Sequence, residues 1–288
     1  MRGHRGVALV SNPATGEILA LSNGTMAFER AFPPGSTAKI VTAAVALEER
    51  IISPADRIFC QRVPPLLGEG FHCSHPRPAG AFTLTSALAN SCNYFFAVLS
   101  TRLRAEALAH GYAIFGLGSP AAGPNSSGDA GRVRVEADPA SKALAALGEG
   151  TIRVTPAQLL AAYSAIATRG VVSGFWQGSG ARHPSPLRHV DLRRETFDVI
   201  EAGLEECVRA GTGQGAAVKG RRVAGKTGTA RIPGGPGATH AWFVGYAPVG
   251  APEVAVVVFL ERGTGARDAA PLAGRILRRY FALTRRTP

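Results

Sequence analysis

The 288-residue sequence suits one large or two small domains, and its 45% apolar residues suffice for a buried core. Its formal net charge of +12 favours anionic surroundings such as lipid headgroups or wall polymers. Nucleic acid also fits the charge, but no recognition motif supports it, so we expect no nucleic-acid partner. No apolar run approaches the roughly 18 residues of a membrane helix, and residues 1–6 lead into no signal-peptide-like stretch. We therefore expect neither an export signal nor an anchor in this sequence.

The elements expected along the chain are strands near both ends and helices between them. Residues 7–10 and 18–21 alternate in hydrophobicity around a turn with Asn12-Pro13 and Gly16, which indicates a β-hairpin. Residues 36–209 are mainly helical in pattern, with 121–131 as a surface loop. Further strands are expected at 222–230, 240–247 and 253–261, followed by a helix at 269–283.

These elements predict an α+β fold of a single domain covering residues 1–288. Residues 1–35 and 210–288 form the sheet part, a five-stranded antiparallel sheet flanked by helices. Residues 36–209 form a largely helical inserted subdomain.

Three short polar segments occur in a fixed order along this framework. They are Ser36-Thr37-Ala38-Lys39 (S-x-x-K), Ser91-Cys92-Asn93 (S-x-N) and Lys226-Thr227-Gly228 (K-T-G). The Pro33-Pro34-Gly35 stretch cannot propagate a helix, whereas the residues after Ser36 have helical spacing. Ser36 is therefore expected at a helix start, with Lys39 on the same face.

This arrangement is typical of nucleophilic catalysis by serine. A serine hydroxyl attacks a carbonyl only when a neighbouring base takes its proton. Lys39 serves as that base only when neutral, so burial and a second cation such as Lys226 must lower its pKa. Ser91 supplies a hydroxyl bridge for the proton, and backbone N–H groups at the helix start face developing negative charge.

Each segment also has a plainer interpretation. Ser36 fits a helix N-cap, the S-x-N segment a polar break between helices, and Lys226 an exposed strand lysine. Residues 220–227 moreover match the nucleotide-binding pattern G-x-x-x-x-G-K-[ST]. A P-loop must lead into a helix, and the Gly- and Pro-rich residues 229–237 cannot start one, which argues against an NTPase.

With these motifs the chain resembles the transpeptidase domain of class B penicillin-binding proteins over nearly its whole length. Further similar segments are Phe115-Gly116-Leu117-Gly118, residues 148–159 (GEGTIRVTPAQL) and residues 242–248 (WFVGYAP). The resemblance implies a helical subdomain beside a five-stranded sheet, with the active site between them. Glu149 stands where the family usually has glutamine.

The resemblance implies a role for each motif residue. Ser36 would attack the carbonyl between two D-alanines of a peptidoglycan stem peptide, with Lys39 as base and Ser91 and Lys226 passing the proton to the leaving D-alanine. Substrate would be held by Asn93, Thr227, Gly228 and Thr229, and the oxyanion by the N–H groups of Ser36 and Thr229. No cofactor is implied for catalysis.

The resemblance also implies a setting and leaves alternatives open. It implies a periplasmic or extracytoplasmic position at the bacterial inner membrane, β-lactam antibiotics as ligands and cell-wall synthesis machinery as partner. D,D-Carboxypeptidase activity differs from transpeptidation only in the acceptor. A class A β-lactamase needs an E-x-x-L-N segment, which is absent, and a class D enzyme has S-x-V in place of Asn93. A β-lactam-sensing receptor domain is the non-enzymatic alternative.

Cys60, Cys73 and Cys92 raise a separate question. In an oxidising compartment Cys60 and Cys73 are candidates for a disulfide. Some class B proteins that the chain resembles instead bind zinc at similar places, with a histidine in a G-H-G segment. That segment is absent, Ala79 being its nearest match, so His75 or His72 would complete a tetrahedral Cys3His site. Free thiols are the third alternative.

Overall fold

Five antiparallel strands form the sheet of this computed structural model, which describes residues 5–76, 80–121, 123, 127–178, 186–232, 234–235 and 237–284. The strands are β1 (Gly6–Ser11), β2 (Ile18–Leu21), β5 (Ala224–Arg231), β6 (Thr239–Ala247) and β7 (Val254–Leu260). Their order is β2-β1-β7-β6-β5, and every neighbouring pair is antiparallel. The predicted fold class is confirmed, because the first hairpin and the last three strands meet in one sheet.

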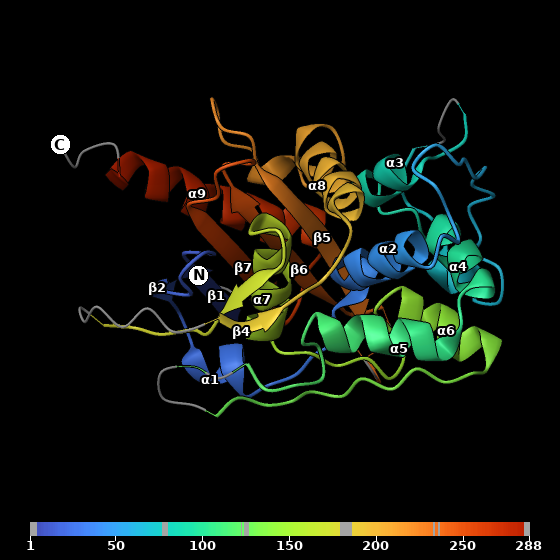
Figure 1. Cartoon of the computed structure of the whole chain (residues 1–288), viewed down its shortest axis with the longest axis horizontal. Helices are drawn as coiled ribbons and strands as arrows, with labels where there is room; N and C mark the ends of the chain where they lie inside the picture. The colour runs from blue at the N-terminus through green and yellow to red at the C-terminus, as the bar shows by residue number, and fades with distance from the viewer. Residues whose placement is uncertain are drawn as a thin grey trace.

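Helices are the main regular elements between the two groups of strands, in line with the helical pattern expected there. They are α1 (Gly24–Phe28), α2 (Lys39–Glu48), α3 (Leu84–Ala89), α4 (Asn93–Arg102), α5 (Ala105–Ile114), α6 (Pro139–Ala146), α7 (Pro156–Ala167) and α8 (Arg194–Arg209). Helix α9 (Ala270–Thr284) ends the described chain, where the sequence predicts a helix. In Figure 1, α2 to α6 lie to one side of the sheet.

Strand β7 shows how the sheet is held between two layers. All seven of its residues are buried. Val256 and Val258 belong to the apolar cluster that contains Leu277 of α9. Val257 and Phe259 belong to the larger cluster shared with the α7 helix. Side chains of a strand alternate between its faces, so a continuous apolar run is the pattern of a strand covered on both sides.

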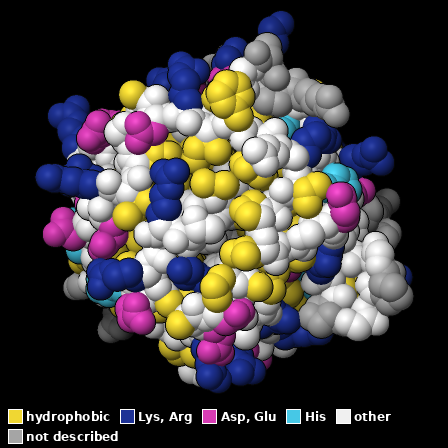
Figure 2. Space-filling model, turned by 90° about the vertical axis from the view of Figure 1, so that its right-hand side faces the viewer, with side chains coloured by type: hydrophobic (Ala, Val, Ile, Leu, Met, Phe, Trp, Pro, Cys, Tyr) yellow, Lys and Arg dark blue, Asp and Glu magenta, His cyan; other side chains and the backbone are white. Residues whose placement is uncertain are grey.

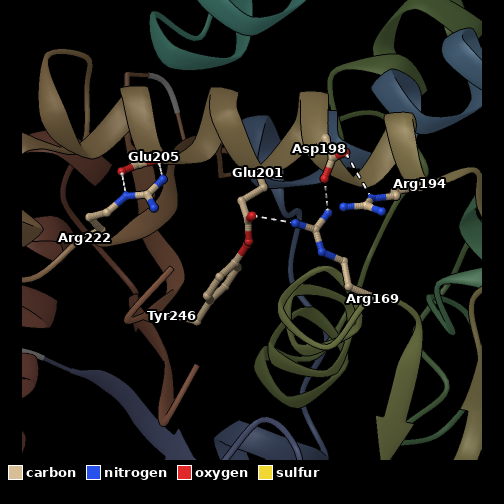
Figure 3. Close-up of polar contacts among 7 residues, drawn as sticks. All are labelled: Arg169, Arg194, Asp198, Glu201, Glu205, Arg222 and Tyr246. Carbon is tan, nitrogen blue, oxygen red and sulfur yellow. Dashed lines mark hydrogen bonds and ion pairs between the residues drawn. The ribbon is translucent and has the colours of Figure 1, made fainter. Parts of the chain in front are cut away.

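Helix α8 is tied to the sheet by polar contacts, drawn in Figure 3. The Tyr246 hydroxyl on β6 donates to Glu201 at 2.8 Å, and Arg169, just after α7, contacts the same carboxylate at 2.7 Å. Arg222, two residues before β5, pairs with both carboxylate oxygens of Glu205 at 2.6 Å. Helix α8 therefore links the end of α7 to β6 and to the segment just before β5, the strand that carries the K-T-G segment.

The middle part contains structure that the sequence did not predict. Strands β3 (Val171–Ser173) and β4 (Pro186–His189) form a small second sheet. Strands this short carry too few alternating residues to be recognised by pattern. Within the 121–131 segment, residues 122 and 124–126 lie outside the described residues. Among the described residues, no helix combines the length and apolarity needed to cross a bilayer.

The surface seen in Figure 2 shows how charge is distributed on one face. Lys and Arg side chains stand mostly around its periphery, with Asp and Glu among them, and the centre is apolar or uncharged. The net positive charge does not gather into one continuous basic stripe on this face.

Candidate active site

Ser36 lies on a tight turn pressed against strand β5. The turn Gly35–Ala38 is a 3-10 helix that leads directly into α2, so the helix start expected at Ser36 is tighter than an α-helix. A Cβ atom on Gly228 would lie 2.8 Å from the Pro34 carbonyl oxygen, so only glycine lets the strand approach this closely. Trp242 and Tyr163 fix the turn from behind through hydrogen bonds to the carbonyls of Pro33 (2.9 Å) and Thr37 (2.8 Å).

Lys39 is fully buried one turn after Ser36. Its Nζ donates to the Ser91 carbonyl (2.8 Å) and Asn93 Oδ1 (2.6 Å) and lies 3.4 Å from Ser91 Oγ. These acceptors favour the ammonium form, whereas burial and then the charge of Lys226 favour the neutral amine. Burial and Lys226 lower the pKa of Lys39 to about 7. A substantial fraction of the amine is therefore neutral near pH 7, as a general base requires.

The S-x-N segment forms the turn between α3 and α4. Ser91 has a positive φ of 56°, Cys92 caps the N-terminus of α4, and Asn93 is the first residue of that helix. The S-x-N segment is therefore a polar break between two helices, as its plainer interpretation predicts. The same turn delivers both Ser91 and Asn93 to Lys39, so the two readings are compatible.

Strand β5 carries the K-T-G segment. Lys226 is fully buried, which lowers its pKa, and its Nζ donates to the Thr227 carbonyl at 3.0 Å. The hydroxyls of Thr227 and Thr212 are 2.5 Å apart, and Thr229 Oγ1 accepts from the Gly265 N–H at 3.0 Å. Because β5 continues as a strand to Arg231, the segment cannot present a helix N-terminus to phosphates, and the NTPase reading is wrong.

The structure joins some of the predicted residues and separates others. Lys39, Ser91 and Asn93 are in direct contact. The Ser36 hydroxyl, in a half-buried residue, makes no hydrogen bond to any described residue, and no hydrogen bond joins Lys226 to Ser91 there. Catalytic hydrogen bonds often tighten only when substrate binds.

Three contacts around the site were missed by sequence reasoning. The Phe71 carbonyl accepts from Asn93 Nδ2 at 3.0 Å. The Arg231 guanidinium lies 4.0 Å from the centre of the Phe71 ring and donates to the Gly70 carbonyl. Residues 69–71 thus connect the S-x-N turn to the end of β5. Thr212, which contacts Thr227, was also missed, since Thr212 lies in no motif.

Cys60, Cys73, His75 and Cys92 come together beside the S-x-N turn. Their four ligand atoms all lie within 4.8 Å of one another. The sulfur separations are 3.7 Å for Cys60–Cys73 and 3.8 Å for Cys73–Cys92, and Cys60 Sγ is 3.6 Å from His75 Nε2. A tetrahedral zinc ion with Zn–S bonds of about 2.3 Å and a Zn–N bond of about 2.0–2.1 Å sets its ligands about 3.8 Å (S to S) and about 3.5 Å (S to N) apart. The three separations given above are close to those of a zinc site.

The surroundings of the cluster also suit a metal. His75 Nδ1 lies 2.7 Å from the Pro76 carbonyl, so that nitrogen carries the proton and Nε2 is free to bind. The backbone N–H groups of Arg62, Tyr94 and Phe95 donate to the three sulfurs. The contact between the Cys73 and Cys92 sulfurs lowers the pKa of Cys73 and raises that of Cys92.

Two of the earlier alternatives are resolved by this geometry. Cys60 and Cys73 are free, so the disulfide is not formed. His75 is 6% exposed and faces the sulfurs, whereas His72 is exposed and contacts the Glu69 carbonyl. His75 is therefore the histidine of the cluster, and Ala79 lies outside the described residues.

Among known proteins, the chain is 30% identical to stage V sporulation protein D of Bacillus subtilis over 94% of its length, covering 48% of that protein. It is 29% identical to the peptidoglycan D,D-transpeptidase PbpA of Mycobacterium tuberculosis over 87% of its length, covering 55% of that protein. The chain thus spans about half the length of these relatives.

Two solved structures share the fold of this chain. The transpeptidase domain of Burkholderia pseudomallei penicillin-binding protein 3 matches 99% of this chain and 90% of its own length, with a TM-score of 0.83 and 27% identity. Pseudomonas aeruginosa PBP2 shares the fold, with a TM-score of 0.85 at 23% identity over 97% of this chain and 74% of that one. The sequence model of one protein family, the penicillin binding protein transpeptidase domain, matches residues 6–280 of this chain. The chain therefore belongs to this family.

Proposed function

We propose that this chain is the catalytic domain of a peptidoglycan D,D-transpeptidase that acts through an acyl-enzyme on Ser36. The observation that carries the proposal is Lys39, one turn after Ser36, buried with a pKa of about 7 and in contact with Ser91 and Asn93. The relative PbpA, a peptidoglycan D,D-transpeptidase, supports the choice of reaction.

In the proposed reaction, neutral Lys39 takes the proton of Ser36 as Oγ attacks the carbonyl between two D-alanines. The backbone N–H groups of Ser36 and Thr229 stabilise the oxyanion. Ser91 and Lys226 pass the proton to the departing D-alanine nitrogen, and the peptidyl ester stays on Ser36. The amine of a second stem peptide then attacks this ester, which forms the cross-link and frees the serine.

Substrate is held on both sides of the serine. We assign the substrate backbone to Asn93, and its terminal carboxylate to Thr227 and Thr229, next to the positive charge of Lys226. Gly228 lets the substrate strand and the Ser36 turn both approach β5. β-Lactams, which resemble the D-Ala-D-Ala end, would acylate the same serine.

Incubation with penicillin followed by mass spectrometry tests the nucleophile. A single adduct on the peptide that contains Ser36, absent in Ser36→Ala, is expected. An adduct that persists in Ser36→Ala rules the assignment out. Rapid repeated hydrolysis of nitrocefin would favour a β-lactamase, since the acyl-enzyme proposed here turns over slowly in water.

A second assay separates transpeptidation from carboxypeptidation. The protein is incubated with a pentapeptide donor and a labelled D-amino acid acceptor. Incorporation of label supports transpeptidation, whereas release of D-alanine without an exchange product means that water is the acceptor.

We also propose that Cys60, Cys73, His75 and Cys92 hold one structural zinc ion, which takes no part in the reaction itself. Four protein ligands leave no open position, and this is typical of structural sites. Elemental analysis should give one zinc per chain in the wild-type protein and in Cys207→Ser, whose cysteine lies outside the cluster, and much less in Cys73→Ser. Four titratable thiols in metal-free native protein would contradict the site.

The setting of the protein belongs to the same proposal. We infer action on the extracytoplasmic side of the inner membrane, where peptidoglycan is cross-linked, together with the cell-wall synthesis machinery. Residues 1–288 would act as one transpeptidase domain, with 1–35 and 210–288 as its sheet part and 36–209 as its mainly helical part.

A further inference from the structure

The turn at Gly148 and Glu149, which follows α6, contacts the active site from two sides. The Gly35 N–H donates to the Gly148 carbonyl at 2.9 Å, immediately before Ser36. The Arg231 backbone N–H, two residues after Thr229, donates to Glu149 Oε1 at 3.3 Å. Gly148 and Glu149 therefore contact both the residue before Ser36 and the end of β5.

The contact with Arg231 falls on the free edge of the sheet. Strand β5 is the last strand and pairs only with β6, in which Thr229 faces Ala241 and Arg231 faces Thr239. Backbone N–H groups two residues apart in a strand point to the same side. Since the Arg231 N–H points away from β6 toward Glu149, the Thr229 N–H points to that free edge as well. Glu149 thus caps the edge that carries the proposed oxyanion donor.

The turn that bears Glu149 is itself firmly held. The Tyr112 hydroxyl donates to the Ala145 carbonyl at 2.6 Å, and the Thr42 hydroxyl to the Ala146 carbonyl at 2.9 Å. Gly148 has a positive φ of 74°, and a Cβ there would lie 2.2 Å from the Gly35 carbonyl oxygen. The Glu149 side chain is only 8% exposed, so its carboxylate has little freedom to move.

We propose that Glu149 is a positioning residue that sets the separation between the backbone N–H groups of Ser36 and Thr229. Through Gly148 and Gly35 the turn fixes the first donor, and through the Glu149 carboxylate and Arg231 it fixes the second. This inference rests on the proposed function, because it concerns the oxyanion of that reaction.

A purely electrostatic role is the competing explanation. The charges that act on the Glu149 carboxylate are those of Arg231, Arg153 and Lys39. Glutamine removes the negative charge but keeps a carbonyl oxygen that accepts from the Arg231 N–H. A positioning role therefore survives Glu149→Gln, whereas an ion-pairing role does not.

The experiment measures acylation by a fluorescent penicillin, with the acylation step and the preceding binding step separated by stopped flow. Removal of an oxyanion donor costs about 10²–10³ in rate, and a displaced donor costs less, so Glu149→Ala should slow acylation by about 10-fold. Binding should change by less than about 3-fold, because ground-state contacts persist. Glu149→Gln should restore most of the rate.

Two further variants keep the test decisive. Glu149→Met has similar length and no acceptor, so it should be as slow as Glu149→Ala and replaces that variant if it fails to fold. Glu136→Gln, in a surface pair with Arg134, is the matched control and should acylate as the wild type does. Wild-type rates in Glu149→Met, or equal losses in Glu149→Gln and Glu149→Met, overturn the proposal. Wild-type protein that no penicillin acylates refutes the proposed function and this inference together.

Discussion

The two walls of the candidate site are built in different ways. Strand β5 is paired with β6 along all eight of its residues, and α8 holds the segment before it. The opposite wall is the loop segment from Ile58 to Phe82, which we call the excursion. Its two end residues form an isolated antiparallel β-bridge with each other. Within the described part of that excursion the one regular element is the 3-10 turn Glu69–Phe71.

The second wall depends on side chains where the first depends on a backbone ladder. Arg62 donates to the carbonyls of Cys73 (2.7 Å) and His75 (3.0 Å), and the cysteine cluster ties the excursion to the S-x-N turn. A ladder adds many similar hydrogen bonds, so losing one changes little. A wall held by a few side chains, and by a metal ion if zinc is bound, loses its order when one of them is removed.

The largest effect is expected at Lys39, which contacts the S-x-N turn and senses the charge of Lys226 on β5. Lys39→Ala should lower the acylation rate by about 10²–10⁴, the usual contribution of a general base. The measurement is the rate of penicillin adduct formation. Lys219→Ala, at an exposed lysine in the segment before β5, serves as control and should keep the wild-type rate. Near wild-type acylation in Lys39→Ala would mean that another group takes the serine proton.

Removal of the proposed zinc ion should affect the two walls differently. Chelation at native pH should raise amide hydrogen exchange across residues 60–75 toward that of an unfolded peptide, because the cluster closes this excursion. Exchange in β5 and β6 should stay slow. Equal loss of protection in both walls would show that the metal supports the whole domain and that the contrast drawn here is wrong.

The same contrast explains how much of the molecule could be predicted. The strands of the sheet lie within two residues of their predicted ranges, since apolar runs such as 254–260 carry a clear signal. The roles of Phe71, Arg231 and Glu149 had no such signal. They depend on which distant residues the fold brings together, as in the contact between Asn93 and the Phe71 carbonyl. For the proposed metal ligands, the family resemblance suggested three cysteines, but only the fold distinguishes His75 from His72.

Acylation should depend on pH through Lys39. Burial and Lys226 lower the pKa of Lys39 to about 7, and only the neutral amine accepts the serine proton. The rate should therefore rise with pH up to about 7 and level off above it, and below that value it should fall about tenfold per pH unit. A pH–rate profile of penicillin acylation between pH 5 and pH 9 measures this. A flat profile would mean that Lys39 is not the titrating base.

The smallest predicted effect concerns the contact that joins the two walls. The Phe71 carbonyl accepts from the amide of Asn93 that we assign to substrate, and the Phe71 ring lies against Arg231 of β5. We expect substrate to take the same N–H of that amide, which requires residues 69–71 to move. An exposed cation–π contact stabilises by about 0.5–1 kcal/mol. Its loss should therefore raise the fraction of molecules in which residues 69–71 have moved away from Asn93 by about 2- to 5-fold.

Phe71→Ala should accordingly raise the penicillin acylation rate by about 2- to 5-fold, while Leu66→Ala, an exposed position in the same excursion, should leave it unchanged. Slower acylation in Phe71→Ala would mean that the ring contacts the penicillin and does not hold residues 69–71 against Arg231 of β5. Because Arg231 keeps its backbone contact with Glu149 in this variant, the β5 edge stays in place. Any change in rate then reports on the excursion alone.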